Sequence, residues 1–426
     1  MKQVPIEELP FSVFDSSIQD VHFFAGTDSY FLGLGIARHE IFSFQPSREE
    51  IGNILSEIAR RSSKEIIIFG GWSFPPSHSE DQATAKKMQV WKDFPYSDWV
   101  IPALTLVYEN GLGRIILAVN VENSSPRLLN EYYEGLVTSL GGLRRKSPVI
   151  PRLVRTTNIP PQGQWKDLVR KALASIRKGE FQKVVPARSV EMLFESDVPC
   201  STVLRKLIQT NPEATIFAIK KGDAVFVGAT PERLFTLKNG NLKVDCLAAS
   251  APRSGDPETD DLLGEDLLRD SKSLYEHKVV VDKVARSLSR ICTRTEVSIE
   301  PTLKKLPNVQ HLLSTVRGKL RPAVDVWSAA QILWPTPATS GEPRESAIRW
   351  IQDFEGIQRG WYSGVVGYVN GKADQGNLYV AIRSALIRKN TAFLFAGSGI
   401  VPGSDPQKEF EETNWKMKTM MNALGQ

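Results

Sequence analysis

The chain has 426 residues, of which 41% are hydrophobic and 24% are charged, and its formal net charge is +5. This length and balance are typical of a globular protein with a sizeable core. The small charge gives no reason to expect nucleic-acid binding, although it suits an anionic small substrate. No apolar run approaches the length of a membrane span, and the N-terminal MKQVPIEELPFSVF has acids and a proline where a secretory signal needs an apolar core.

Three cysteines, Cys200, Cys246 and Cys292, lie far apart in the chain. Their odd number and wide spacing match neither a zinc site nor a disulfide framework. We therefore expect three small buried hydrophobic side chains in a reducing compartment, and a cytoplasmic protein.

Residues 1–142 contain strand-like segments broken by glycine, such as FFAGTDSYFLGLGIAR and EIIIFGGWSFPP. Hairpin signals occur at Asn110-Gly111, Asn239-Gly240 and Asn370-Gly371. This number of hairpins favours large antiparallel sheets over a doubly wound parallel sheet. We expect residues 1–142 to join the same fold as the rest of the chain, because their strands would otherwise lack helices to cover them.

A basic, proline-rich segment spans residues 143–163, has no helical or strand periodicity, and is interpreted as a connection. The clearest helix of the chain comes next and ends at Gly179. One face of this helix is apolar, formed by Trp165, Leu168, Val169, Ala172, Leu173 and Ile176. From there to the C-terminus, strands are predicted to alternate with helices.

The segment AGSGIVPGSDPQKEFEETNWKMK, residues 396–418, is predicted to run from a buried strand through a glycine turn into a helix. Asp405 followed by Pro406 is a favourable helix start. Helical spacing then puts Glu409, Glu412 and Lys416 on one face. The two carboxylates are either a solvated face or ligands for a hard cation such as magnesium, which prefers oxygen ligands.

This segment resembles the C-terminal signature of the chorismate-utilising enzymes, a family that includes isochorismate, salicylate, anthranilate and aminodeoxychorismate synthases. Other segments resemble family motifs in the same order along residues 160–424, whereas the resemblance in residues 1–140 is limited to IIIFGGWSF. The resemblance implies an α+β fold of two stacked, largely antiparallel sheets flanked by helices, with residues 164–426 as the chorismate-binding catalytic region.

Two residues in these motifs correspond to an acid–base pair. Lys183, in RKGEFQKVVPARS, is similar to the family lysine that activates water, and Glu232, in FVGATPERLF, to the glutamate that protonates the departing hydroxyl. On local grounds alone, Lys183 is more often an exposed edge-strand lysine, and Glu232 is more often an exposed turn glutamate paired with Arg233. A lysine works as a base only when its amine is neutral, which requires desolvation or neighbouring cations, so the catalytic role predicts an enclosed Lys183.

The resemblance also implies a Mg²⁺ ion. In Tyr275-Glu276-His277 the glutamate matches a family metal ligand, and Glu276 would share the ion with Glu409 and Glu412. Several glutamates beside a dianionic substrate would repel one another strongly without such a cation. The alternative for Glu276 is a solvated ion-pair face on its helix.

Substrate contacts are implied at ten further positions. Arg383 stands out without the resemblance, because a guanidinium on an apolar strand needs an anionic partner, and a substrate carboxylate is the implied one. Ala249 departs from the glycine usual in its motif, where an added methyl crowds a ligand. The implied substrate-binding residues are Ala248, Ser250, His311, Ala338, Tyr368, Arg383, Gly397, Ser398, Gly399 and Lys416.

Two features distinguish between family members. Relatives that use ammonia lack a lysine at the position of Lys183. Relatives that expel pyruvate have threonine at the position of Ala338, which follows Pro337 in this chain. The resemblance therefore implies an isochorismate synthase, which adds water at C2 of chorismate and removes the C4 hydroxyl, for menaquinone or siderophore synthesis. A salicylate synthase, an ammonia-using synthase and an inactive partner subunit are the alternatives. The last one is kept open by Trp334, where many relatives have histidine, and by Ala249, where glycine is usual. We expect a monomer or homodimer.

Overall fold

The structure is a computed structural model that describes residues 11–27, 29–42, 63, 65–76, 90–109, 111–118, 134, 148–306, 309–322, 324 and 326–426. Its strands form two large sheets and a short ribbon, and every strand pair in these ranges is antiparallel. The hairpin signals at Asn239-Gly240 and Asn370-Gly371 lie between paired strands, as predicted, and Gly111 lies between another pair. Asn110 is outside the described residues.

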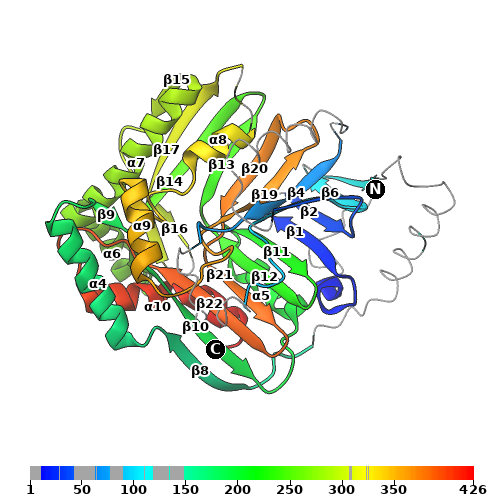
Figure 1. Cartoon of the computed structure of the whole chain (residues 1–426), viewed down its shortest axis with the longest axis horizontal. Coiled ribbons are helices and arrows are strands. Elements are labelled where there is room, and N and C mark those ends of the chain that lie inside the picture. The colour runs from blue at the N-terminus through cyan, green and yellow to red at the C-terminus, as the bar shows by residue number, and fades with distance from the viewer. Residues whose placement is uncertain are drawn as a thin grey trace.

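The first sheet has ten strands (Figure 1). In spatial order they are β7 (Leu112–Leu117), β6 (Leu104–Glu109), β2 (Ser29–Leu34), β1 (Asp20–Ala25), β11 (Thr215–Lys221), β12 (Ala224–Thr230), β21 (Ser384–Arg388), β22 (Thr391–Gly397), β10 (Ala187–Phe194) and β8 (Leu153–Ile159).

The second sheet also has ten strands, and a two-stranded ribbon stands beside it. The order is β15 (Cys292–Val297), β17 (Val309–Leu320), β14 (Asn241–Pro252), β13 (Arg233–Lys238), β20 (Gln375–Val380), β19 (Val365–Asn370), β4 (Ile67–Trp72), β5 (Ser97–Ile101) and β3 (Arg38–Phe42), with β16 (Thr302–Lys305) paired to β17. The ribbon pairs β9 (Lys183–Val184) with β18 (Gly341–Glu342).

An aromatic layer joins the two sheets. Phe24 and Phe31 project from the first sheet and Phe69 and Tyr368 from the second, with 4.1 Å between the ring centroids of Phe31 and Tyr368. The Phe24 and Phe69 rings stack at 6.0 Å. Such large rings bury much apolar area, so this layer holds the sheets face to face and confirms the predicted stack.

Helices cover the outer faces of the stack (Figure 1). Apolar side chains of α4 (Gln162–Arg177), α7 (Ser271–Ile291), α8 (Val326–Leu333) and α9 (Arg344–Phe354) share a core with the second sheet. Those of α5 (Cys200–Thr210), α10 (Pro406–Ala423) and the short 3₁₀ helix η2 (Phe11–Asp15) share a core with the first sheet. One more helix, α6 (Pro257–Arg269), packs against α7 and β14.

Strands from residues 20–117 lie in both sheets, where they pair with strands from the later part of the chain. The segment at 143–163 differs from our interpretation as a connection, because β8 lies within it and pairs with β10 at the sheet edge. Most of β8 is exposed on both faces, which explains why its sequence lacks a strand pattern. Within the described residues, no helix is long and apolar enough to cross a membrane.

Candidate active site

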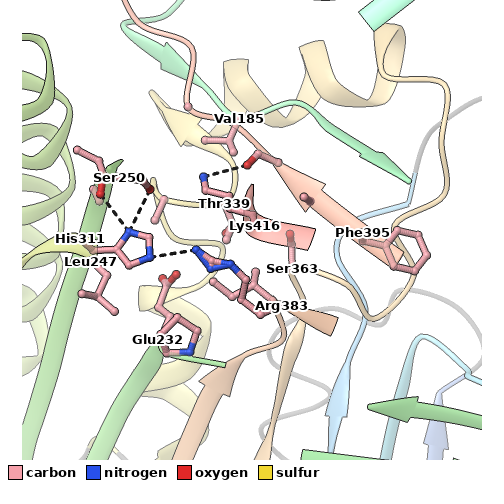
Figure 2. A pocket seen from close by; sticks show the side chains of 18 of the residues that line it. Val185, Glu232, Leu247, Ser250, His311, Thr339, Ser363, Arg383, Phe395 and Lys416 are labelled. Atoms are coloured by element: carbon pink, nitrogen blue, oxygen red, sulfur yellow. Dashed lines mark hydrogen bonds between the residues drawn. The ribbon is translucent and has the colours of Figure 1, made fainter. Parts of the chain in front are cut away.

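A pocket opens where the β14–β17 and β21–β22 strand pairs face the segment between α8 and α9 (Figure 2). Its polar side chains include Glu232, Ser250, Glu276, His311 and Arg383. The other lining residues are Val185, Pro231, Leu247, Ala248, Ala249, Ala338, Thr339, Tyr362, Ser363, Ile382, Phe395, Ala396, Gly397, Gly399 and Lys416.

Lys183 lies beside this pocket on β9 and is only 1% exposed. Its Nζ donates a hydrogen bond of 2.9 Å to Oε1 of Glu276, which comes from α7. Gly399, which lines the pocket together with Glu276, packs closely on the pair, since a Cβ at this position would come 2.4 Å from Glu276 Oε1 and 3.0 Å from Lys183 Cε. The structure therefore encloses Lys183, rather than leaving it at an exposed sheet edge.

Glu232 occupies the turn after β12 and is buried in the pocket wall. Burial raises the pKa of its carboxyl from 4.5 to about 7, although a hydrogen bond from Thr336 and the positive charges of Lys183, Arg383 and Lys416 oppose the shift. The Thr336 hydroxyl lies 3.2 Å from Glu232 Oε1. Near neutral pH this carboxyl is therefore present in both protonation states, which is what a general acid requires.

Arg233, the alternative partner for Glu232, instead donates to the Thr236 hydroxyl at 3.1 Å and lies over the Tyr379 ring. Glu232 is thus a buried pocket carboxyl and not a surface turn residue in an ion pair.

Arg383 and His311 form a polar pair on the pocket floor (Figure 2), with 3.0 Å between Arg383 NH2 and His311 Nε2. The other ring nitrogen, Nδ1, lies 3.0 Å from the Ala249 carbonyl oxygen and 3.0 Å from Ser250 Oγ. Because a carbonyl only accepts, Nδ1 is assigned the hydrogen and Nε2 accepts from the guanidinium. Burial, helped by the positive charges of Arg383 and Lys416, lowers the pKa of His311 to about 3, so the ring is neutral.

A neutral imidazole leaves the charge of Arg383 available to an anion in the pocket. Burial lowers the pKa of this guanidinium only to about 10, so it stays charged at neutral pH. Arg383 does not lie within a continuous strand, as the sequence suggested. It occupies the break between β20 and β21 with φ of 52°, a left-handed conformation unusual for arginine that directs the side chain into the pocket.

Ala248 and Ser250 flank a β-bulge in β14. The residue between them, Ala249, has φ of 57°, which explains why glycine is usual in this motif. Alanine holds this conformation at a strain of roughly 1 kcal/mol, and its carbonyl still reaches His311.

The proposed metal ligands Glu409 and Glu412 meet at Ser398. The Ser398 hydroxyl contacts Glu412 Oε2 at 3.0 Å and also contacts Glu409 Oε2. Lys272 lies 2.7 Å from Glu409, and Lys416 lies 2.5 Å from Glu412. Together with the Lys183–Glu276 pair, each of the three glutamates has its own lysine.

The pKa values of these two carboxyls move in opposite directions. Burial and then the charge of Glu412 raise the pKa of Glu409, whereas the charge and hydrogen bond of Lys416 outweigh burial and lower the pKa of Glu412 to about 2. Opposite shifts of this kind are expected for adjacent acids, because each carboxylate disfavours ionisation of the other.

The oxygen ligands near the Gly397–Gly399 turn suit magnesium in chemistry, because Glu276, Glu409 and Glu412 offer carboxylate oxygens and Ser398 offers a hydroxyl. The arrangement differs from the prediction of three glutamates around a common ion. Among the described residues, no three His, Cys, Asp or Glu side chains are grouped to hold a metal ion. The lysine pairs account for this, since each one draws its glutamate toward a different cation.

Comparison with known proteins shows to which family the chain belongs. The model of the family described as chorismate binding enzyme matches residues 4–425. The chain belongs to this family. The isochorismate synthase MenF of Bacillus subtilis is 33% identical over 87% of this chain and 77% of its own length. The salicylate biosynthesis isochorismate synthase of Pseudomonas aeruginosa is 32% identical over 83% of this chain and 73% of its own length.

The structure is also similar to solved chorismate-binding enzymes. The menaquinone-specific isochorismate synthase MenF of Escherichia coli superposes with a TM-score of 0.82 and 25% identity, covering 97% of this chain and 91% of that one. Anthranilate synthase component I of Streptococcus pneumoniae shares the fold at a TM-score of 0.74 and 22% identity, covering 92% of each chain. The family and the fold predicted from the sequence are both confirmed.

Most of the predicted substrate-binding residues of this chorismate-binding enzyme come together. Ala248, Ser250, His311, Ala338, Arg383, Gly397, Gly399 and Lys416 all line the pocket. Lys416 Nζ donates to the Gly397 carbonyl at 3.0 Å, and this hydrogen bond holds the Lys416 ammonium at the edge of the pocket.

Two of the predicted positions need correction. The backbone N–H of Ser398 donates to Pro186 O at 3.1 Å and its hydroxyl faces Glu409 and Glu412, so it supports the glutamates and does not offer its N–H to substrate. Tyr368 lies in the aromatic layer, where it packs on Phe31 and its hydroxyl accepts from Asn377 Nδ2 at 3.1 Å.

The tyrosine that lines the pocket of this chorismate-binding enzyme is Tyr362, six positions earlier in the same motif. Sequence reasoning also missed Thr336 and Thr339, although both lie in the ILWPTPATSGEP segment. The departure at Trp334 is accommodated structurally, since its Nε1 donates to the Ser363 carbonyl at 3.0 Å and so supplies a ring N–H, as a histidine can.

Proposed function

We propose that this enzyme is an isochorismate synthase, which converts chorismate reversibly into isochorismate by adding water at C2 and removing the C4 hydroxyl. The observation that carries the proposal is the pairing of a buried, partly protonated Glu232 with an enclosed Lys183 at one pocket. An acid and a base are both needed when water enters at one carbon and hydroxide leaves from another.

In this proposal, substrate is recognised by the two cationic side chains that line the pocket, Arg383 and Lys416. Arg383 offers a guanidinium whose charge is not used by the neutral His311, and Lys416 adds a second cation at the Gly397 end. A dicarboxylate substrate would bind these groups through charge-assisted hydrogen bonds. Leu247, Tyr362 and Phe395 supply apolar surface for the ring.

In the proposed reaction Glu232 gives its proton to the departing hydroxyl. The carboxylate that remains is stabilised by the nearby charges of Lys183, Arg383 and Lys416, the same charges that oppose the rise in its pKa. Lys183 takes a proton from the attacking water, for which its amine must first be neutral. Enclosure between β9, α7 and Gly399 keeps bulk water from competing with that transfer.

We further propose that Mg²⁺ is required, and that Glu276, Glu409 and Glu412 would hold it in exchange for the lysine partners that they have in this structure. When bound, this ion would offset the negative charge that a substrate carboxylate adds beside three glutamates. Ser398 already holds Glu409 and Glu412 toward each other.

Menaquinone synthesis in the cytoplasm is our proposal for the cellular setting, with the enzyme acting as a monomer or homodimer. Relatives named for menaquinone and for siderophore pathways both occur among the similar proteins, so the choice of menaquinone is the finer part of the proposal. Three free, buried cysteines are consistent with a reducing compartment.

The test is a product assay. Purified protein is incubated with chorismate and Mg²⁺, with and without ammonium, and the products are separated by chromatography. Isochorismate as the sole product, independent of ammonium, is the expected result. Release of pyruvate with salicylate, or a product that forms only with ammonium, would reassign the enzyme to another reaction of its family. A Glu232→Gln variant serves as the control for enzyme-dependent turnover.

A further inference from the structure

A buried ion pair lies behind the pocket, outside the residues that line it. Arg359 and Glu355 are 4% exposed each; Glu355 directly follows α9, and Arg359 lies four residues later, outside the helix. Two contacts join them, from Arg359 Nε to Glu355 Oε1 at 2.7 Å and from Arg359 NH2 to Glu355 Oε2 at 2.5 Å.

The same guanidinium reaches two backbone carbonyls that belong to the pocket wall. Arg359 NH1 donates to Thr339 O at 2.8 Å, and NH2 donates to Val185 O at 2.6 Å. Thr339 and Val185 both line the pocket, yet they come from segments more than 150 residues apart in the chain. The Phe74 ring covers the guanidinium face at 4.2 Å, which fixes its plane.

Each of the two segments leads directly to one of the proposed acid–base residues. Val185 is two residues after Lys183. On the other segment, the Thr339 hydroxyl lies 3.2 Å from the Thr336 hydroxyl, which in turn donates to Glu232 Oε1 at 3.2 Å. The planar guanidinium of Arg359 therefore connects two segments. One follows Lys183 on β9, and the other contains Thr336, which contacts Glu232.

Glu355 strengthens this arrangement in two ways. It neutralises Arg359 in a place where an uncompensated charge would be costly. It also accepts a hydrogen bond of 2.8 Å from the backbone N–H of Ala187, the first residue of β10. The carboxylate thus ties the start of β10 to the same guanidinium that holds Val185 and Thr339.

We propose that Arg359 and Glu355 are positioning residues that set the separation of Lys183 and Glu232 through the Val185 and Thr339 carbonyls. The proposal rests on the proposed acid–base function. Neither Arg359 nor Glu355 lines the pocket, so we expect them to act on the geometry of the reacting groups and not through substrate contacts.

Arg359→Lys tests the geometry while it keeps the charge. An ammonium cannot reproduce the planar fork that serves Glu355, Thr339 and Val185 at once. Since small misplacements of reacting groups lower rates strongly, we expect kcat to fall at least about tenfold, with KM changed by less than about threefold because the substrate contacts remain. If Thr336 moves away from Glu232, the hydrogen bond that lowers the pKa of the Glu232 carboxyl is weakened. The pH at which kcat falls on the alkaline side of its profile should then become higher.

The matched control is Lys221→Arg, which exchanges the cation of another buried ion pair. Lys221 Nζ lies 2.6 Å from Asp98 Oδ2, and both residues lie outside the pocket. We expect this variant to change the melting temperature more than kcat.

Unchanged kcat and pH profile in Arg359→Lys, with only a lower melting temperature, would overturn the proposal and leave the pair with a purely structural role. If Arg359→Lys does not fold, Glu355→Gln decides by the same measurements, since the amide keeps the shape but removes the counter-charge and one of the two oxygens that accept from Arg359 and Ala187. The wild-type product identifies the reaction, whereas the ratio of variant to wild-type kcat tests the positioning role for whichever product forms. The two proposals can therefore fail separately.

Discussion

Lys183 and Glu276 form an enclosed ion pair, with 2.9 Å between Nζ and Oε1, in which the proposed base is bound to a proposed metal ligand. The two roles of Glu276 are alternatives for one carboxylate, which can neutralise the lysine or face a divalent cation. In the proposed mechanism, binding of the cation by Glu276 would release Lys183 from this ion pair.

Lys183→Ala should abolish most turnover while the protein still folds. Loss of a general base typically costs about 100-fold or more in kcat. Glu276 keeps a side-chain exposure of 14% toward the pocket, so water can solvate its charge in the variant. The measurements are chorismate turnover and the melting temperature.

Lys278→Ala is the matched control, because Lys278 is an exposed lysine of α7 that pairs with Asp282 at 2.9 Å. It should leave both quantities nearly unchanged. Turnover of Lys183→Ala within a factor of two of wild type would remove Lys183 from the mechanism.

Glu232 predicts a specific pH dependence. Because burial raises the pKa of its carboxyl to about 7, the protonated acid is lost as pH rises through 7, and kcat should fall over the same range. A carboxyl with a raised folded-state pKa also stabilises the fold most at pH below its usual 4.5, and this contribution is lost as pH rises toward 7.

The amide of Glu232→Gln cannot ionise. The variant should therefore lose this pH dependence of folding stability, and it should also lose nearly all turnover. Rate profiles and thermal unfolding across pH 4 to 8 measure both effects. A wild-type kcat that stays flat through pH 7 and beyond would argue against Glu232 as the proton donor.

The residues that sequence reasoning found correctly sit in short, self-contained motifs. Lys183 follows a helix and its glycine stop, and Glu232 follows a strand and Pro231; local pattern alone favoured an exposed edge lysine and an exposed turn glutamate, and the resemblance of these motifs to the family placed both residues at a pocket. The same holds for Arg383, whose buried charge demanded a partner.

What the sequence could not supply was register between distant strands. Tyr368 pairs with Phe69 across β19 and β4, which turns its ring into the aromatic layer, while Tyr362 precedes β19 and is free to reach the pocket. The Lys272–Glu409 pair was missed because its two residues come from different helices, α7 and α10, whose approach the sequence does not show. β8 escaped notice because pairing with β10, and not an apolar face, holds it in place.

Gly399 tests the closeness of the Lys183–Glu276 pair to the pocket. Gly399→Ala would place a methyl 2.4 Å from Glu276 Oε1 and 3.0 Å from Lys183 Cε, so the pair must move. We expect kcat to fall by about tenfold or more, as for other small displacements of reacting groups. Gly163→Ala, on the exposed start of α4 with no atom within 4 Å of the added carbon, should have no effect on turnover. Equal turnover in the two variants would contradict the placement of Lys183.

Ala249 tests whether a departure from the family pattern carries a cost. Ala249→Gly relieves the strain of a left-handed alanine at φ of 57° and should stabilise the fold by about 1 kcal/mol. The His311 contact uses the backbone carbonyl, so turnover should stay within about twofold of wild type. Thermal unfolding and turnover decide the matter, and a loss of stability would show that the methyl packs favourably in the bulge.

Magnesium dependence is the remaining prediction. Chelation should remove turnover, and added Mg²⁺ should restore it, because three glutamates beside a dicarboxylate substrate need a compensating cation. Calorimetric titration gives a readout independent of turnover. Glu412→Gln should weaken Mg²⁺ binding by at least about tenfold, the change that accompanies roughly 1.4 kcal/mol of lost binding free energy. Asp261→Asn, an exposed acid of α6 that contacts Lys305, should bind as wild type does. If Glu412→Gln binds Mg²⁺ as tightly as Asp261→Asn, the ion lies elsewhere and the carboxylates around Ser398 serve only their lysines.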